Sequence, residues 1–439
     1  MKHFIQGFFW LGFYLVVSLM PLAVVFIGPR PPGRDFLTEL SVALGFVGLA
    51  MIGLQFFLTA RFRLIEAPYG LDIILRFHRE ISTAAFLIIF AHPLLILWRD
   101  QSLYILNLPQ QPARVWFAVI SFVALAAIMI TSIWRQRLGL SYETWRVIHG
   151  SLAIAALGFA LGHVIGVGHY IANLWQQILW ITMAAASVLV LLYIRVFKPL
   201  FMKRRRPYAV TEIRSEGGDA WTLRCVPDGH RGIRFEAGQF AWLTLRDSPF
   251  TIEEHPFSIA SSALEEDYVE FTIKELGDFT SELDTVESGS TAYIDGPYGA
   301  FSCERYPAAG YVFIAGGIGI TPIMSMLRTL ADYGDTRPLV LVFAAARREN
   351  LTFFDEIEAL KDRLANLQTV YVLTKPPEDW SGETGFVDTD LLRRYLPDHP
   401  ERHQYFLCGP FPMLINIEQA LLDVDVPGTH IHAELFNLV

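Results

Sequence analysis

Residues 75–98 read LRFHREISTAAFLIIFAHPLLILW, an apolar stretch long enough to cross a membrane as one helix. A second stretch, residues 146–163, reads RVIHGSLAIAALGFALGH. Each stretch contains two histidines whose positions differ by 14 residues. At 3.6 residues per turn this spacing is almost four turns, so both histidines of a stretch share one helix face and lie about 21 Å apart. The positions are His78 and His92 in the first stretch, and His149 and His163 in the second.

The whole N-terminal part of the chain is apolar in the same way. Of 439 residues 53% are hydrophobic, and the long apolar runs lie before residue 199. Six runs approach the ~20 residues that a membrane-spanning helix needs. The first run is too long for a signal peptide and is followed by no small-residue cleavage site, so it is kept as a span. We expect an all-α bundle of six transmembrane helices over residues 1–199, with spans at 4–27, 36–59, 80–98, 115–134, 147–170 and 174–195.

Basic residues beside the spans predict the orientation of the bundle. With the N-terminus in the cytosol, 14 Lys and Arg residues lie on the cytosolic side and four on the opposite side. This bias follows the positive-inside rule, so the segment after the last span is expected in the cytosol as well. The cytosolic set is Lys2, Arg61, Arg63, Arg76, Arg79, Arg135, Arg137, Arg146, Arg195, Lys198, Lys203, Arg204, Arg205 and Arg206; the opposite set is Arg30, Arg34, Arg99 and Arg114.

The third and fifth spans run in the same direction, which brings their histidines to two common levels. His78 then faces His149 near the cytosolic side, and His92 faces His163 near the outer side. Neutral imidazole is a good axial ligand for haem iron, and a histidine inside a membrane needs a partner. We therefore expect two bis-histidine haems; the alternative is that these histidines form hydrogen bonds between helices. His169, at the outer end of the fifth span, is interpreted first as an ordinary polar residue of a span end; a role as an acceptor-side group is the alternative.

The part of the chain after residue 199 has the composition of a soluble protein. It contains 21 Lys and Arg and 37 Asp and Glu, against 14 and 7 before it. An acidic domain of this kind argues against nucleic-acid binding. Its three cysteines have no CxxC spacing, which argues against a disulfide framework, a thiolate zinc site or an iron–sulfur cluster. They are Cys225, Cys303 and Cys408.

Two patterns divide this soluble part. Short alternating segments over residues 200–304, such as YVEFTIKEL, predict a cytosolic antiparallel β-barrel. Over residues 305–439 strands alternate with helices, which predicts an α/β nucleotide-binding domain with a parallel sheet.

A glycine-rich turn follows the first strand of the α/β region. It consists of Gly316, Gly317, Ile318, Gly319, Ile320, Thr321 and Pro322. Glycines at such a turn let the backbone approach a phosphate, although packing alone also produces glycine-rich turns. The next strand ends at Arg347 and Arg348, where a cation could bind the 2′-phosphate of NADPH; ordinary solvent-exposed arginines are the alternative.

Five motifs in this order resemble the flavin and nicotinamide motifs of NADPH oxidases and ferric reductases. They are HPFSIAS (255–261), KELGDFT (274–280), DGPYG (295–299), GGIGITP (316–322) and CGP (408–410). That family also has six spans with paired haem-ligating histidines on the third and fifth, so the resemblance covers nearly the whole chain. Each motif alone is shared with soluble ferredoxin–NADP reductase relatives.

The resemblance implies an FAD site and an NADPH site. The flavin ring and its phosphates would contact His255, Pro256, Phe257, Ser258 and Ile259, with Ser258 near flavin N5. The flavin pyrophosphate loop would comprise Lys274, Gly277, Asp278, Phe279 and Thr280. Gly317 to Thr321 would hold the NADPH pyrophosphate, and Cys408, Gly409 and Pro410 would lie beside the nicotinamide. Phe436 resembles the C-terminal aromatic that stacks on the flavin in this family, although Asn437, Leu438 and Val439 follow it. Ser258, Cys408 and Phe436 are therefore the expected catalytic residues.

The resemblance further implies a multi-pass protein of the cell membrane that transfers electrons from NADPH through FAD and two b-type haems. Flavin accepts a hydride and releases single electrons, so it belongs between nicotinamide and haem. Three acceptors on the opposite side stay open: O2 giving superoxide, a ferric chelate or other metal, and an extracytoplasmic redox protein. The predicted outer loops, 28–35, 99–114 and 171–173, are short and carry no dedicated iron-binding cluster, which favours O2. The sequence shows no EF-hand loop, so calcium control is not indicated.

Overall fold

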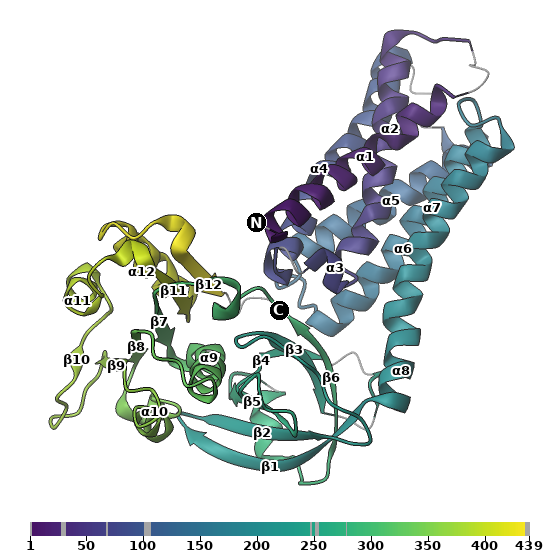
Figure 1. The fold of residues 1–439 in the computed structure, drawn as a ribbon. Coiled ribbons are helices and arrows are strands. Elements are labelled where there is room, and N and C mark those ends of the chain that lie inside the picture. The colour runs from purple at the N-terminus through teal and green to yellow at the C-terminus, as the bar shows by residue number, and fades with distance from the viewer. Residues whose placement is uncertain are drawn as a thin grey trace. The chain divides into compact units, whose positions relative to one another are not determined.

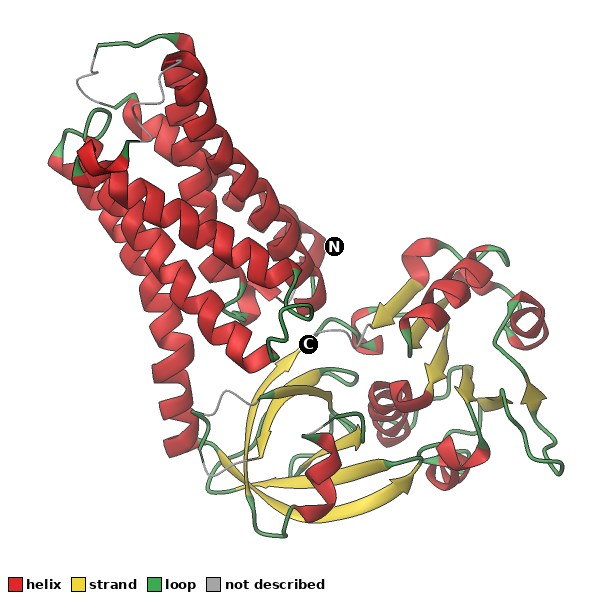
Figure 2. Cartoon of the chain, turned by 180° about the vertical axis from the view of Figure 1, so that it is seen from behind, coloured by secondary structure: helices red, strands yellow, loops and turns green. Residues whose placement is uncertain are grey.

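The computed structural model describes residues 2–27, 32–66, 69–100, 107–245, 248–250, 254–277 and 279–434. The chain divides into two compact units, Met1–Lys198 and Pro199–Val439. Figures 1 and 2 show long helices in the first unit, and two β-sheets with shorter helices in the second.

Long helices lying side by side form the first unit (Figures 1 and 2). Six helices of the described chain are long and apolar enough to cross a membrane, which confirms the expected six-helix bundle. The short helix α3 (Arg63–Glu66) follows the second of them, and the last continues through a π-helical turn (Tyr193–Phe197) into α8 (Lys198–Arg205). The six long helices are α1 (Lys2–Val25), α2 (Phe36–Leu58), α4 (Leu71–Asp100), α5 (Ala113–Ile133), α6 (Tyr142–Val167) and α7 (Leu174–Leu192).

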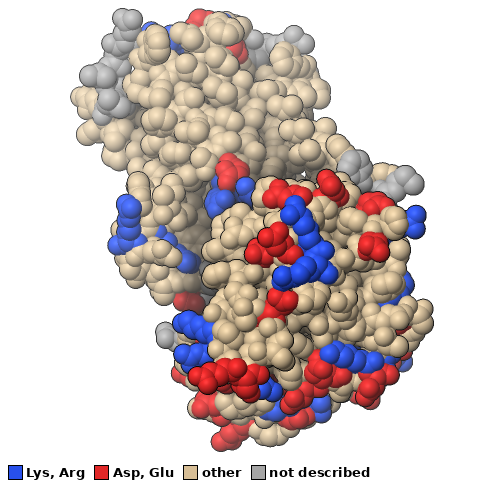
Figure 3. Space-filling view, turned by 90° about the vertical axis from the view of Figure 1, so that its left-hand side faces the viewer, with Lys and Arg blue, Asp and Glu red and all other residues tan. Residues whose placement is uncertain are grey.

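The surface of this bundle is apolar. Large side chains such as Phe8, Trp98 and Leu174 are 61%, 75% and 71% exposed. The face that Figure 3 shows carries few charged residues over the first unit and many over the second. Apolar surface of this extent is unfavourable in water and suits the hydrocarbon core of a bilayer.

Two of the helices begin earlier than the apolar runs indicated. Helix α4 begins at Leu71 rather than near residue 80, and α6 begins at Tyr142 rather than near residue 147. Ser141 caps α6 by accepting a hydrogen bond from the Thr144 N–H at 3.2 Å. The first turns of both helices contain polar residues, which a search for apolar runs leaves out. All four paired histidines therefore lie inside helices.

An antiparallel sheet opens the second unit. Its strands are β1 (Pro207–Gly217), β2 (Ala220–Pro227), β3 (Phe240–Leu245), β4 (His255–Ser258), β5 (Val269–Lys274) and β6 (Thr291–Tyr298), in the order β4-β3-β6-β1-β2-β5. A bridge between Ile259 and Phe271 connects the end of β4 with β5, which curls the sheet around a core containing Tyr208 and Leu223. The expected antiparallel barrel is confirmed as a half-barrel.

A parallel sheet forms the rest of this unit, which confirms the expected α/β domain. The strand order across the sheet is β10-β9-β8-β7-β11-β12, so β7, the first of these strands in sequence, lies in the middle. The chain builds outward on one side to β10 and returns to β11 on the other side of β7. The strands are β7 (Gly310–Gly316), β8 (Leu339–Ala345), β9 (Leu367–Leu373), β10 (Glu383–Thr384), β11 (His403–Cys408) and β12 (Ile431–Glu434).

Helices cover both faces of the parallel sheet: α9 (Ile320–Asp332) and α10 (Phe354–Leu360) on one, α11 (Thr389–Tyr395) and α12 (Phe411–Leu422) on the other. Successive residues of a strand point to opposite faces. Phe313 of β7 accordingly packs in the core with α9 and α10, whereas Val312 and Ile314 pack with α11 and α12. With both faces covered, the carboxyl ends of the strands are left for a ligand.

Candidate functional site

The four paired histidines form two couples between α4 and α6. The ring centroids of His78 and His149 are 6.4 Å apart, and those of His92 and His163 are 6.3 Å apart. The two couples thus have nearly the same separation at two levels of the bundle. These are the pairings that the 14-residue spacing predicted.

The distance between the two ring centroids of each couple fits one metal ion bound by both rings. An imidazole nitrogen lies about 2 Å from a bound transition metal and roughly 1 Å from its own ring centre, so two rings on one metal have centroids about 6 Å apart. Rings that hydrogen-bonded each other directly would be closer. The side chains present therefore fit two bis-histidine haems.

A cavity of about 610 Å³ is lined by both rings of the His92–His163 couple. Its size falls within the range of about 300–1,000 Å³ that ligand sites in proteins occupy. Most of its walls are aliphatic or aromatic side chains of α2, α4, α5 and α6, as a porphyrin requires. Two cations, Arg34 and Arg99, also line it and could pair with porphyrin carboxylates. His169 also lines this cavity.

The predicted flavin segments meet on the half-barrel. The ring of His255 in β4 stacks on Phe279 at a centroid distance of 4.2 Å, and Phe257 stacks on Phe279 at 6.1 Å. Ser258 is buried at the end of β4, beside Phe240 of β3. Residues of HPFS and KELGDFT, far apart in sequence, thus form one aromatic cluster.

The remaining residues of these segments are placed as follows. The Thr280 hydroxyl accepts hydrogen bonds from the N–H groups of Leu276 at 2.7 Å and Gly277 at 2.9 Å, which fixes the loop after β5. Lys274 is the last residue of β5, and Asp278 lies outside the described residues. Pro256 pairs with Trp242 of β3, whereas the Ile259 side chain belongs to the barrel core.

The predicted dinucleotide loop lies at the switch point of the parallel sheet. Strands β7 and β11 are neighbours, and the connections that follow them leave the sheet toward opposite faces. Ligands of open α/β sheets bind at such a point, outside the carboxyl ends of the strands. Gly316 ends β7 and residues 317–319 follow it, whereas residues 409–410 follow β11. Topology therefore brings the two nicotinamide motifs together.

Close backbone packing explains the glycines at this point. A Cβ on Gly319 would lie 2.2 Å from the Cys408 carbonyl oxygen, and one on Gly316 would lie 2.9 Å from Pro410 Cδ. A Cβ on Gly409 would lie 3.1 Å from Gly316 Cα. Only glycine fits at Gly316 and Gly319 without displacing the neighbouring loop. Both explanations of these glycines, close backbone packing and approach to a phosphate, are thus compatible with the structure.

The other residues of the two motifs are mostly buried. Burial, and secondarily the charge of Glu434, raise the pKa of the Cys408 thiol well above its usual value, so this side chain is a neutral core residue. The Thr321 hydroxyl donates to the Thr272 carbonyl of β5 at 3.4 Å. Pro322 lies in the first turn of α9. Ile320 is fully buried, and Ile318 is half-buried.

Arg347 and Arg348 are exposed and begin two residues after Ala345, the last residue of β8, which is the neighbour of β7 in the sheet. Arg348 forms a long ion pair of 3.8 Å with Asp379. This is the edge of the sheet at which a 2′-phosphate would lie. Phe436 lies outside the described residues.

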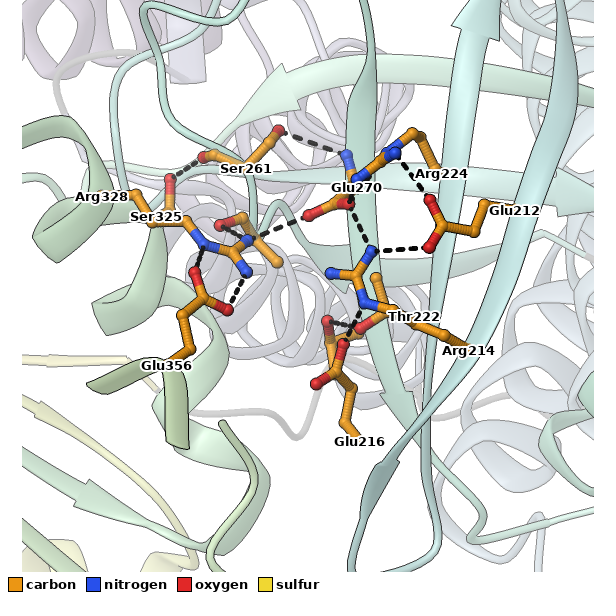
Figure 4. Close-up of polar contacts among 12 residues, drawn as sticks. Glu212, Arg214, Glu216, Thr222, Arg224, Ser261, Glu270, Ser325, Arg328 and Glu356 are labelled. Atoms are coloured by element: carbon orange, nitrogen blue, oxygen red, sulfur yellow. Dashed lines mark hydrogen bonds and ion pairs between the residues drawn. The ribbon is translucent and has the colours of Figure 1, made fainter. Parts of the chain in front are cut away.

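A buried ion network, which the sequence did not indicate, joins the half-barrel to the α/β domain (Figure 4). The Glu270 side chain of β5 is 3% exposed and accepts hydrogen bonds from Arg214 of β1 and Arg224 of β2, both at 2.9 Å. Arg328 of α9 donates to its other oxygen at 3.1 Å and to Glu356 of α10 at 2.6 Å. A charged residue in an alternating strand usually faces solvent, whereas here α9 covers it.

Two helix residues beside the histidines were missed as well. Ser41 of α2 contacts the His92 ring, and the Arg114 carbonyl of α5 contacts the His163 ring, each at 2.8 Å. Such contacts depend on how the helices pack, so no local pattern reveals them.

The fold and these sites define a class of protein. A half-barrel with an aromatic cluster at its predicted flavin segments, followed by a parallel sheet with a glycine-rich loop at its switch point, is typical of a flavin-dependent NAD(P)H oxidoreductase. Here that unit is joined to six helices of membrane-spanning length.

Three family models match the chain in succession. The "Ferric reductase like transmembrane component" matches residues 44–160, an "FAD-binding domain" matches residues 218–302, and an "Oxidoreductase NAD-binding domain" matches residues 313–419. These matched domains, in this order, give the chain the architecture of the NADPH oxidase and ferric reductase family. The chain is thus similar to a ferric-reductase-like membrane component followed by oxidoreductase domains for FAD and NAD.

Curated relatives are similar over part of their length. NADH-cytochrome b5 reductase 1 of Pyricularia oryzae is 32% identical over 35% of this chain and 51% of its own. The reductase component of propane 2-monooxygenase of Rhodococcus jostii is 33% identical over 50% of this chain and 60% of its own. The chain thus spans between about half and three fifths of these relatives. Among solved structures, the FAD/NAD-binding domain of nitric oxide dioxygenase from Vibrio cholerae is 21% identical, with a TM-score of 0.47 over 52% of this chain and 97% of that domain.

Proposed function

We propose that the chain oxidises NADPH in the cytosol and reduces O2 to superoxide on the opposite side of the cell membrane, by means of FAD and two b-type haems. NADPH gives up a hydride, which carries two electrons, and each O2 accepts one. Two superoxide ions and one proton are therefore produced for each NADPH converted to NADP⁺.

The single observation that carries the proposal is the distance between the ring centroids within each histidine couple, which is 6.4 Å for His78 and His149 and 6.3 Å for His92 and His163. His78 with His149 would hold one haem, and His92 with His163 the other. Haem, when bound, supplies a centre that accepts and releases one electron at a time. The helices α4 and α6 hold both couples in the apolar interior of the bundle, and the excess of basic residues predicts which end is cytosolic.

At the nucleotide end, the proposed roles follow from position. The backbone of Gly317 to Thr321 would hold the NADPH pyrophosphate at the N-terminus of α9, and Arg347 would bind the 2′-phosphate. Ser258 and the His255–Phe279 stack would orient the flavin. Because the Cys408 thiol is buried and protonated, we assign Cys408 to Pro410 a role in shaping the nicotinamide pocket rather than one in acid–base chemistry.

O2 is the acceptor that best suits the outer level. Its reduction to superoxide takes one electron and needs no proton from a side chain. The predicted outer loops are short and carry no dedicated iron-binding cluster, which favours O2 over a ferric chelate.

Purified protein loaded with FAD tests this assignment of the acceptor. NADPH should reduce added cytochrome c in air, and superoxide dismutase should abolish that reduction. Turnover that requires an added ferric chelate and ignores dismutase would assign the chain to metal reduction instead. Turnover only with an added extracytoplasmic redox protein would assign it to a relay.

A further inference from the structure

The two histidine couples differ in the hydrogen-bond partners of Nδ1, the ring nitrogen that would not bind the metal. In the His92–His163 couple, His92 Nδ1 lies 2.8 Å from the Ser41 carbonyl oxygen, and His163 Nδ1 lies 2.8 Å from the Arg114 carbonyl oxygen. A carbonyl oxygen only accepts hydrogen bonds, so both Nδ1 atoms donate. This leaves the lone pair of each ring on Nε2, the nitrogen available to a metal.

The His78–His149 couple has weaker contacts. His78 Nδ1 is buried with no hydrogen-bond partner among the described residues. His149 Nδ1 lies 3.3 Å from the Ser132 hydroxyl, which also accepts a hydrogen bond from Trp145 Nε1 at 3.3 Å. The inner rings are therefore less firmly fixed, and neither has a carbonyl acceptor in the described part of the chain.

Small residues of α2 allow the His92 ring to contact Ser41. Ser41 is fully buried, and its hydroxyl lies 2.8 Å from His92 Nδ1 while donating to the His92 carbonyl at 2.8 Å. One turn further along the same face, a Cβ on Gly45 would already lie 3.3 Å from His92 Nδ1. A Cβ on Gly48 would lie 2.4 Å from Ile89 of α4. Close approach of α2 to α4 through small residues thus brings the Ser41 backbone and hydroxyl to the ring.

We propose that Ser41 and Gly45 form a seat for His92 that fixes its tautomer and ring orientation and lowers the midpoint potential of the outer haem. The inference rests on the proposed function, because it requires a haem between His92 and His163. A hydrogen bond from Nδ1 to an oxygen acceptor increases electron donation through Nε2. Stronger donation stabilises ferric over ferrous iron, so the potential falls. Ser41 is a positioning residue in this account, since it acts through His92.

A redox titration of haem absorbance in the full-length, FAD-loaded protein tests the seat. Ser41→Ala removes one of the two oxygen acceptors around His92 Nδ1, so one of the two reduction steps should shift to a more positive potential while the other stays in place. Ser41→Thr keeps a hydroxyl and should restore the original step. Ser187→Ala is the matched control, because Ser187 is a fully buried serine of α7 whose hydroxyl donates to the Gly53 carbonyl at 3.1 Å and which does not line the cavity around His92 and His163.

Each outcome separates the seat from the proposed function. If wild-type protein binds no haem, the proposed function fails. If haem is bound and both steps of Ser41→Ala match those of wild type, only the seat is overturned. If Ser41→Ala loses one haem per chain and Ser187→Ala keeps both, the result supports the seat as the feature that holds His92 in place. Gly45→Ala supplies a second variant: its methyl group would press on the ring, and an unchanged potential and low-spin spectrum would also overturn the seat.

Discussion

Arg328 of α9 donates a hydrogen bond to the Glu270 carboxylate of β5 at 3.1 Å, and this contact joins the two elements next to the predicted nucleotide loops. Strand β5 ends at Lys274, the first residue of the predicted flavin loop (274–280), and α9 begins at Ile320, within the glycine-rich segment 316–322. Ser325 reinforces the joint, because its hydroxyl donates to the Ser261 carbonyl at 2.7 Å. The predicted flavin and dinucleotide segments are thus connected by a buried charge cluster (Figure 4).

Neutralising Glu270 should therefore be costly. Glu270→Gln leaves three arginines without their shared carboxylate, and removing one partner of a buried ion cluster typically costs about 3–5 kcal/mol. Chemical denaturation of the flavin-loaded protein, followed by flavin fluorescence, should show a loss of this size. The matched control is Glu266→Gln, whose exposed pair with Arg234 spans 3.9 Å and should contribute nothing measurable. Equal stability of the two variants would contradict the structural role of the network.

The same carboxylate should make the second unit sensitive to acid. Burial raises the pKa of Glu270, but hydrogen bonds and charges from Arg214, Arg328 and Arg224 outweigh burial and hold this pKa below its ordinary value of 4.5. A lowered pKa contributes stability that is complete above the unfolded-state value and is lost as the pH falls through the folded-state value. The difference in unfolding free energy between wild type and Glu270→Gln should thus shrink as the pH is lowered below 4.5. A difference independent of pH would show that the charge of Glu270 is not its source.

Gly319 should tolerate no side chain. In Gly319→Ala the new methyl group would lie 2.2 Å from the Cys408 carbonyl oxygen, so the two loops at the switch point must separate. Overpacking of this kind costs about 1–3 kcal/mol, and NADPH should no longer reduce the flavin at the wild-type rate. Stopped-flow measurement of flavin bleaching checks this. Gly428→Ala is the control, because its methyl group would lie at an ordinary contact distance of 3.7 Å from Leu422. Similar rates of flavin reduction in both variants would show that these loops are not part of the NADPH site.

Arg347 should discriminate between NADPH and NADH. A charge-assisted hydrogen bond to the 2′-phosphate is worth about 1.5–3 kcal/mol, so Arg347→Gln should raise the KM for NADPH at least about tenfold and leave that for NADH unchanged. Arg393→Gln, another exposed arginine of the same domain, should change neither. Steady-state kinetics with both nucleotides measure the effect, and equal changes for NADPH and NADH would show that Arg347 does not read the phosphate.

Local periodicity explains what the sequence could reveal and what it could not. The histidine couples were predictable because a 14-residue spacing on parallel helices depends only on helix geometry. The strand–helix alternation likewise predicted the parallel sheet. In contrast, the contacts of Ser41 and Arg114 arise from the packing of α2 and α5 against α4 and α6. Glu270 was missed for the same reason, since a glutamate in an alternating strand looks solvent-facing until α9 is placed over it.

The most direct test of the account is the haem content of purified protein carrying His92→Leu or His163→Leu. Reduced-minus-oxidised spectra and a pyridine haemochrome assay should find two low-spin b-type haems per chain in wild type and a loss of one in each variant. His169→Leu is the control, because His169 lines the same cavity but belongs to neither couple, and it should keep both haems. Wild-type protein without haem, or full haem content in both His92→Leu and His163→Leu, would contradict the account.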